Sequence, residues 1–461
     1  DSDGISVGAL STNSGTLKDA AGNDLTLTLN SVGATSNVLV DSIAPTVSSV
    51  SVPSNDTYIA GENLEFTVNT SENVTVDTTS GTPSIAITVG SSTKNATYVS
   101  GSGSSALTFR YTVESGLVDS DGISVGALST NSGTLKDAAG NDLTLTLNSV
   151  GATSNVLVDS IAPTVSSVSV PSNDTYVAGE SLEFTVNTSE NVTVVTTGGT
   201  PSIAITVGGS TKNATYVSGS GSSALTFRYT VESGLVDSDG ISVGALSTNS
   251  GTLKDSVGNN LTLTLNSVGA TSNILVDSAV PTITNVTSSN ADGSYKAGDT
   301  ITLSVAFSES VNVTGTPSLS LETGVTDREA SYVSGSGTDT LSFTYTVQSG
   351  DESADLDYTA TSSLSLNSGT INDAAGNAAT LTLATPGAAN SLGANKALII
   401  DAVVPTVSSV SVPSNDTYVA GENLEFTVNT SENVTVNTAG GTPSIAITVG
   451  STTKNATYVS G

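Results

Sequence analysis

Apolar and polar residues alternate along most of the chain with a period of two, which is typical of β-strands that bury one face. Clusters of Gly, Ser, Asn, Asp and Pro separate the alternating segments. Such short strands, with no helical period between them, predict an all-β fold: a two-sheet sandwich of immunoglobulin type. Between residues 41 and 158 the expected strands are Thr46–Val52, Leu64–Thr70, Ser84–Val89, Asn95–Ser100, Ala106–Glu114, Ile123–Ser129 and Leu143–Ser149.

The same pattern recurs as internal repeats. The linker DSIAPTV begins at Asp41 and again at Asp159, and related linkers begin at Asp277 and Asp401. Successive linkers are 118, 118 and 124 residues apart, because six extra residues precede the last one. The predicted domains are three complete repeats, 41–158, 159–276 and 277–400, and two partial repeats, 1–40 and 401–461.

The two end segments correspond to parts of a repeat. Residues 1–40 match the C-terminal part of a complete repeat, and residues 401–461 match the N-terminal part. We expect the chain to be a window of a longer array, in which repeats contact only their neighbours and together form an elongated rod. Alternatively, neighbouring chains complete the half-repeats by donating strands. Against this, the two halves together lack a counterpart of Ser102–Val118.

Composition narrows the classes of function. The chain of 461 residues contains no Cys and no His, so it has no thiolate nucleophile, imidazole base or Cys/His zinc site. Its net charge of −31 argues against nucleic acid as a partner. Aromatic residues are only 4% of the chain, which argues against a glycosidase cleft with paired carboxylates. No apolar run approaches the roughly 18 residues that span a bilayer. We therefore expect no enzymatic activity and no membrane span in this segment.

Three motifs resemble a known family. Phe307–Val311 reads FSESV, DAAGN begins at Asp19, Asp137 and Asp373, and D-x-x-x-P-T forms the linkers. These motifs resemble the bacterial Ig-like repeats of S-layer-associated proteins and giant biofilm adhesins. Some copies depart from them, with TSENV for FSESV and DSVGN at Asp255. The resemblance implies extension modules of secreted proteins at the cell surface, often rigidified by calcium.

Acidic residues concentrate in the loops at the two ends of each expected sandwich. Oxygen ligands without nitrogen or sulfur suit Ca²⁺, and clustered carboxylates repel one another unless a cation bridges them. The simpler alternative is that these residues are solvated turn residues and caps. The candidate ligands are Asp41, Glu72, Asp137 and Asn141 at one end of the first complete repeat, Asp119 and Asp121 at its other end, facing the next linker, and the later residues Asp159, Glu190, Asp255, Asn259, Asp277, Glu309, Asp373 and Asn377.

These observations lead to one hypothesis and two alternatives. The hypothesis is the structural repeat region of a secreted bacterial surface adhesin or extracellular fibre, a cation-stiffened spacer for cell-surface or biofilm attachment. Its partners would be neighbouring repeats, copies of itself and surface or matrix polysaccharide. The first alternative is a self-assembling filament or sheath with strand pairing between chains. The second is a carbohydrate-binding or receptor-binding module, for which only the third repeat, with its Ala379–Ile400 insertion, offers a distinctive loop.

Overall fold

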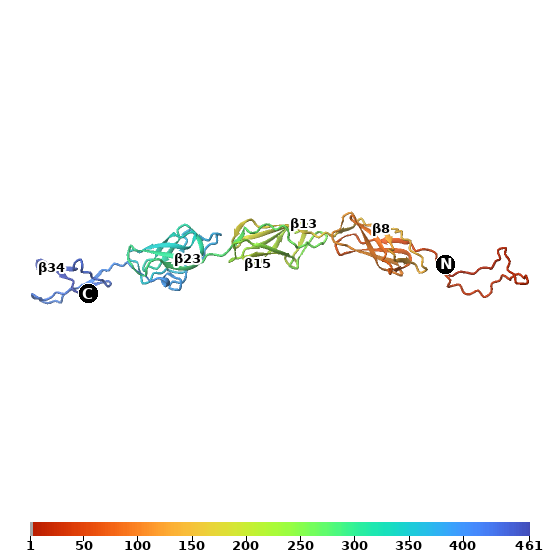
Figure 1. Ribbon diagram of the computed structural model, residues 1–461. Coiled ribbons are helices and arrows are strands. Elements are labelled where there is room, and N and C mark those ends of the chain that lie inside the picture. The colour runs from red at the N-terminus through yellow and green to blue at the C-terminus, as the bar shows by residue number, and fades with distance from the viewer. Residues whose placement is uncertain (1–2) are drawn as a thin grey trace. The chain divides into compact units, whose positions relative to one another are not determined.

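The computed structural model describes residues 3–461, and its regular secondary structure is almost entirely β-strand (Figure 1). The first two residues of the expected partial repeat 1–40 lie outside the described residues. The predicted fold class, all-β with tandem sandwich repeats, is confirmed. The chain forms two compact units, one of the residues up to Ser172 with Leu182–Tyr229 and Ser242–Ser272, and one of Asn173–Ser181, Thr230–Ile241 and Asn273–Gly461.

Each complete repeat contains a large and a small sheet. In the first complete repeat the large sheet has the order β1-β3-β6-β5-β4-β8, with β9 paired to β3, and the small sheet has the order β2-β10-β7. In the small sheet β10 runs parallel to β2 and antiparallel to β7. The strands are β1 (Val47–Ser51), β2 (Asp56–Tyr58), β3 (Asn63–Asp77), β4 (Ser84–Val89), β5 (Ser92–Ser100), β6 (Ser104–Thr112), β7 (Val118–Asp119), β8 (Ser124–Ser129), β9 (Thr134–Lys136) and β10 (Val156–Asp159).

The following repeats have equivalent strands in the same sheet orders. The next set is β11 (Val165–Ser169), β12 (Asp174–Tyr176), β13 (Ser181–Val195), β14 (Ser202–Val207), β15 (Ser210–Ser218), β16 (Ser222–Thr230), β17 (Val236–Asp237), β18 (Ser242–Ser247), β19 (Thr252–Lys254) and β20 (Ile274–Asp277). The third set is β21 (Ile283–Ser288), β22 (Gly293–Tyr295), β23 (Thr300–Thr314), β24 (Ser318–Leu321), β25 (Arg328–Ser334), β26 (Thr338–Thr346), β27 (Glu352–Ser353), β28 (Leu364–Ser365), β29 (Thr370–Asn372), the short helix α1 (Leu392–Asn395) and β30 (Leu398–Asp401). Two hairpins follow, β31 (Val407–Ser411) with β32 (Thr427–Thr430), and β33 (Ser444–Val449) with β34 (Thr452–Thr457).

The core of the first complete repeat lies between its two sheets. Phe66 of β3 and Phe109 of β6 are fully buried and pack in one cluster with Val156 and Val158 of β10. Tyr98 meets the Phe109 ring edge to face, with ring centroids 5.8 Å apart. The third repeat has an equivalent cluster that joins its large sheet to β30. Burial thus follows the alternation of apolar residues that the sequence shows.

One predicted strand, Leu143–Ser149, was wrong. Instead of a continuous ladder, isolated bridges join Thr144 to Thr46 and the following Val150 to Val50. Between them the Asn148 side chain, through Nδ2, donates a hydrogen bond to the Val47 carbonyl at 3.1 Å. A side-chain amide therefore takes an acceptor that a continuous backbone ladder would use.

The alternation also missed part of the architecture. The strand expected at Leu64–Thr70 extends to Asp77, because β3 shifts register between Asn69 and Val74 and then pairs with β9. Strands β2, β7, β9 and β10 have two to four residues. So short a strand shows no period of its own, and it forms only because a distant segment supplies its partner.

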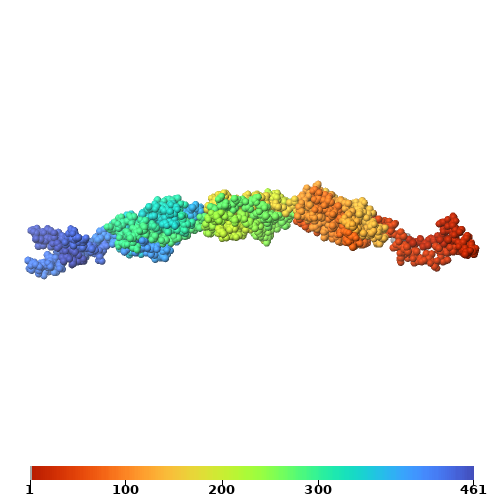
Figure 2. All heavy atoms as spheres, in the orientation of Figure 1, coloured from red at the N-terminus to blue at the C-terminus, as the bar shows by residue number. Residues whose placement is uncertain are grey.

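The partial repeats expose much of their apolar surface. Leu25 is 54% exposed and Val412 is 70% exposed, whereas their counterparts in complete repeats are buried or partly buried. In Figure 2 the atoms of residues 3–40, in red, form a thin and open layer. Among the described residues, no helix is long and apolar enough to cross a membrane.

Candidate metal sites at the joints between repeats

Three carboxylates predicted to converge at the first linker do so. Asp41, Glu72 and Asp137 each place one oxygen within 4.8 Å of the others. Asp41 lies in the linker, and Asp137 follows β9 and is buried. Glu72 was expected in a loop, but it lies inside β3 at the register shift, which turns its side chain toward the linker end.

The equivalent cluster of the third repeat is Asp277, Glu309 and Asp373, again with one oxygen each within 4.8 Å. Asp277 is the last residue of β20, Glu309 lies in β23 and Asp373 follows β29. The Oδ1 atom of Asp277 is buried and has no hydrogen-bond partner among the residues that the structure describes. A buried carboxylate oxygen without a donor is unfavourable unless a cation balances it.

The middle linker has the equivalent three carboxylates, but they are not among the described groups whose oxygens all lie within 4.8 Å of one another. Asp159 ends β10, Glu190 lies in β13, and Asp255 follows β19 and is buried. Burial and the negative charges of Asp255 and Asp159 raise the pKa of the Glu190 carboxyl above its usual value. Glu190 is therefore close enough to both aspartates for their charges to act on it.

The Asn that recurs in the loop after β9, β19 and β29 has a structural role. Nδ2 of Asn377 donates to Oδ2 of Asp373 at 2.8 Å and to the backbone carbonyl of Asp277 at 2.9 Å. We expected these Asn residues to add a fourth ligand oxygen, but the amide acts as a donor that ties loop to linker. The same bonds join Asn141 to Asp137 and Asp41, and Asn259 to Asp255 and Asp159.

Electrostatics differ among the members of a cluster. Burial and the charge of Asp373 raise the pKa of Asp277, and burial with the charges of Asp277 and Asp373 raises the pKa of Glu309. Burial also acts to raise the pKa of Asp137, but hydrogen bonds from Asn141 and the loop backbone outweigh it and lower that pKa. Asp137 of the first cluster is thus stabilised as an anion by several donors, whereas in the third repeat Asp277 receives only the backbone N–H of Ala279 and Glu309 has no donor among the described residues.

The residues predicted at the opposite end of the sandwich have another role. Oδ2 of Asp119 accepts the backbone N–H of Gly90 at 2.6 Å, and Oδ1 accepts that of Gly122 at 2.8 Å. Asp119 therefore connects the β4–β5 turn to the loop after β7, which agrees with the alternative that these acidic residues serve as turn residues and caps. Asp121 is exposed, and the carboxylate of Asp159 acts on Glu190 rather than completing a second site with this pair.

The raised pKa values predict how pH acts on metal-free protein. Glu309 titrates above its ordinary 4.5 and Asp277 above its ordinary 3.8, so the folded third repeat retains protons that the unfolded chain has released. Their contribution to the free energy of unfolding is thus present below these ordinary values and is lost as the pH rises through the raised ones. Urea unfolding in chelator between pH 4 and 7, monitored by hydrogen exchange, should show this loss of stability. Glu309→Gln should reduce the loss. If the free energy of unfolding fell equally steeply with pH in both proteins, the assignment would be contradicted.

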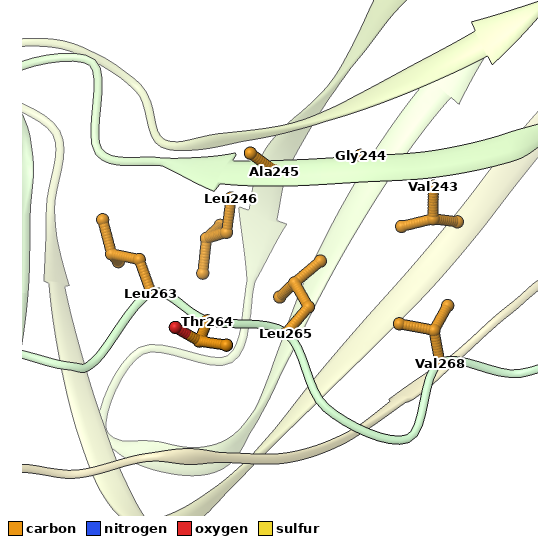
Figure 3. A pocket seen from close by; sticks show the side chains of 8 residues that line it. All are labelled: Val243, Gly244, Ala245, Leu246, Leu263, Thr264, Leu265 and Val268. Atoms are coloured by element: carbon orange, nitrogen blue, oxygen red, sulfur yellow. The ribbon is translucent and has the colours of Figure 1, made fainter.

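A separate feature is an apolar groove of about 510 Å³ beside β18, the edge strand of its sheet. Figure 3 shows side chains from β18 and from the 263–268 segment facing one another across it; Val243, Leu246, Leu263, Leu265 and Val268 are among them. In the third repeat the N–H of Leu383, in the corresponding segment, donates to the Thr361 carbonyl at 2.9 Å. The groove contains no aromatic platform or charged group for a sugar.

Comparisons with known proteins add little to this geometry. The chain matches no family model, and no curated protein is significantly similar to it. A solved DUF4785 family protein from Legionella pneumophila shares 12% identity over 67% of this chain and 87% of its own, with a TM-score of 0.17. A Salmonella alpha-2-macroglobulin variant shares 9% identity over 72% and 23%, with a TM-score of 0.14. Neither likeness carries an argument. The class defined by the fold is therefore a tandem β-sandwich repeat protein with acidic joints.

Proposed function

We propose that this chain is the repeat region of a secreted bacterial surface adhesin or extracellular fibre, a spacer whose joints take up calcium. Near-identical sandwiches supply length through copy number, and they offer no set of distinct faces for distinct partners. The absence of cysteine leaves the joints without disulfides, and a net charge of −31 creates a demand for cations. The resemblance of the FSESV and DAAGN motifs to surface-protein repeats points the same way.

The main support for the proposal is that the linker aspartate takes part in both repeats of a joint. Asp277 pairs with Val236 in the small sheet that ends one repeat. Its carboxylate meets Glu309 and Asp373 of the following repeat. A cation bound there would contact groups on both sides of the joint, so binding and joint order would be coupled.

The donor set fits calcium. Three carboxylates offer up to six oxygens, and Ca²⁺ takes six to eight oxygens in irregular geometry. The unpartnered Oδ1 of Asp277 and the raised pKa of Glu309 both mark oxygens that lack a compensating charge. The residues would supply only oxygen ligands, and we assign the metal a structural role.

Melting and small-angle scattering of the full chain, with calcium and with chelator, test the proposal. A ligand at 100 times its dissociation constant stabilises the folded state by about 2.7 kcal/mol, so calcium should raise the melting temperature clearly. It should also narrow the range of dimensions that scattering reports. Potassium at matched ionic strength controls for general screening. If calcium changes neither quantity, the spacer has no cation-dependent joints.

A further inference from the structure

In the joint between the repeats 41–158 and 159–276, an apolar side chain approaches the loop of the following repeat, and the described residues of the next joint show no such approach. Cδ1 of Ile59 lies 3.9 Å from the place that a Cβ would occupy on Gly258. Ile59 follows β2 of one repeat, and Gly258 belongs to the loop that carries Asp255 in the next. At Gly376, the equivalent position in the next joint, no atom of the described residues outside the adjoining chain lies within 4 Å of that place.

The sequence differs between copies at the same two places. The equivalent of Ile59 is the smaller Val at Val177 and Val419, and the third repeat has Lys296 there. Val257 replaces the alanine that the DAAGN copies have at Ala21, Ala139 and Ala375. Both larger residues therefore occur together, on opposite sides of one joint. Gly258 is partly buried whereas its counterpart Gly376 in the next joint is exposed, and Val257 and Ala375 are both partly buried.

The loop that carries Val257 is held in place from within. Oδ1 of Asp255 accepts backbone N–H groups from Val257 at 3.0 Å, Gly258 at 2.7 Å and Asn259 at 2.8 Å. Asn259 in turn donates to the Asp159 carbonyl of the linker. An apolar residue packed on such a loop meets a fixed surface, so little conformational entropy opposes the contact.

We propose that Ile59 with Val257–Gly258 forms an apolar clasp that keeps this joint ordered without a cation. The next joint has Val177 and Ala375 in the same places, and it relies on its acidic cluster. Apolar burial is insensitive to chelation, whereas carboxylate repulsion is relieved only by bound cations or protons. The inference about the second joint rests on the proposed calcium function, and the inference about the clasp does not.

The chain has no cysteine, so spin labels can be placed at will. Ser100, Ser218 and Ser334 are exposed and occupy equivalent positions at the ends of β5, β15 and β25. The full chain with Ser100→Cys and Ser218→Cys reports the first joint, and the full chain with Ser218→Cys and Ser334→Cys reports the second. In chelator, electron–electron distance measurements should give a narrow distribution for the first pair and a broad one for the second. Adding Ile59→Ala should broaden the first.

Introducing the larger residues of the first joint into the second joint tests whether they are sufficient to order it. Val177→Ile with Ala375→Val should narrow the second distribution in chelator, and Val419→Ile, which lies beyond that joint, should not. A first distribution that is already broad in chelator, or that Ile59→Ala leaves narrow, would overturn the clasp. If calcium fails to narrow the second distribution, the calcium function fails, while a narrow first distribution still supports the clasp.

Discussion

Replacing Asp351 by alanine is expected to lower the free energy of unfolding of the third repeat by about 3 kcal/mol. Asp351 is 1% exposed, and its Oδ1 accepts Nε of Arg328 at 2.9 Å. Its Oδ2 accepts the Tyr345 hydroxyl and the Gln348 backbone N–H. Removing the carboxylate leaves the buried Tyr345 hydroxyl and the largely buried Arg328 guanidinium without this partner. Because the Arg328 side chain is 25% exposed, we expect a loss of stability at the lower end of the range for broken buried ion pairs.

Hydrogen exchange in β26 measures this loss without requiring the whole chain to unfold in one step. Two tyrosines provide a matched comparison. Tyr345→Phe should destabilise, because a hydrogen bond to a carboxylate contributes about 1.5–3 kcal/mol. Tyr111→Phe should cost much less, because its hydroxyl makes no hydrogen bond of regular geometry and meets only the Lys94 ammonium and the Glu114 backbone, with no carboxylate partner. Equal effects of the two changes would contradict the network.

Replacing Glu309 by glutamine is expected to have opposite effects with and without calcium. In calcium the variant should lose most of the cation-dependent stabilisation, about 2–3 kcal/mol at saturation, because one charged ligand is gone. In chelator the variant should be more stable than the original chain, because Glu309 no longer repels Asp277 and Asp373. Calorimetric melting under both conditions measures the two signs.

The control is Glu329→Gln, which removes one exposed charge of β25, a strand that pairs with β24 and β26 and not with β23. It should change stability by less than about 0.5 kcal/mol in either condition. A variant at Glu309 that behaves like this control, or that shifts stability in the same direction with calcium and with chelator, would show that the cluster is a set of independently solvated charges.

Local pattern predicted much of the fold. Leu107, Phe109 and Tyr111 alternate with polar residues in β6, and all three are buried. The period failed where partners are distant or side chains compete for the backbone. Leu143–Ser149 alternates as well as any strand, yet it forms only isolated bridges. The two-residue β7 has no pattern at all, and it exists because β10 pairs with it.

The candidate site was predictable in part. Strand order alone placed Asp277, Glu309 and Asp373 at one end of a sandwich, and their oxygens lie within 4.8 Å of one another. The role of Asn377 as a donor to the linker was not predictable, since an amide can offer either its oxygen or its nitrogen. The use of Asp119 to bind two backbone N–H groups was also hidden, because it depends on a turn 29 residues away in sequence.

By itself, the sequence determined that this protein is a series of β-sandwiches with acidic linkers, because alternation and repetition are local properties that need no knowledge of distant contacts. Only the tertiary structure decided which carboxylates lack donors, which amide ties loop to linker, and where Ile59 meets Gly258. These features arise from competition among distant groups for hydrogen-bond partners and for space, and the register of the sheets settles that competition.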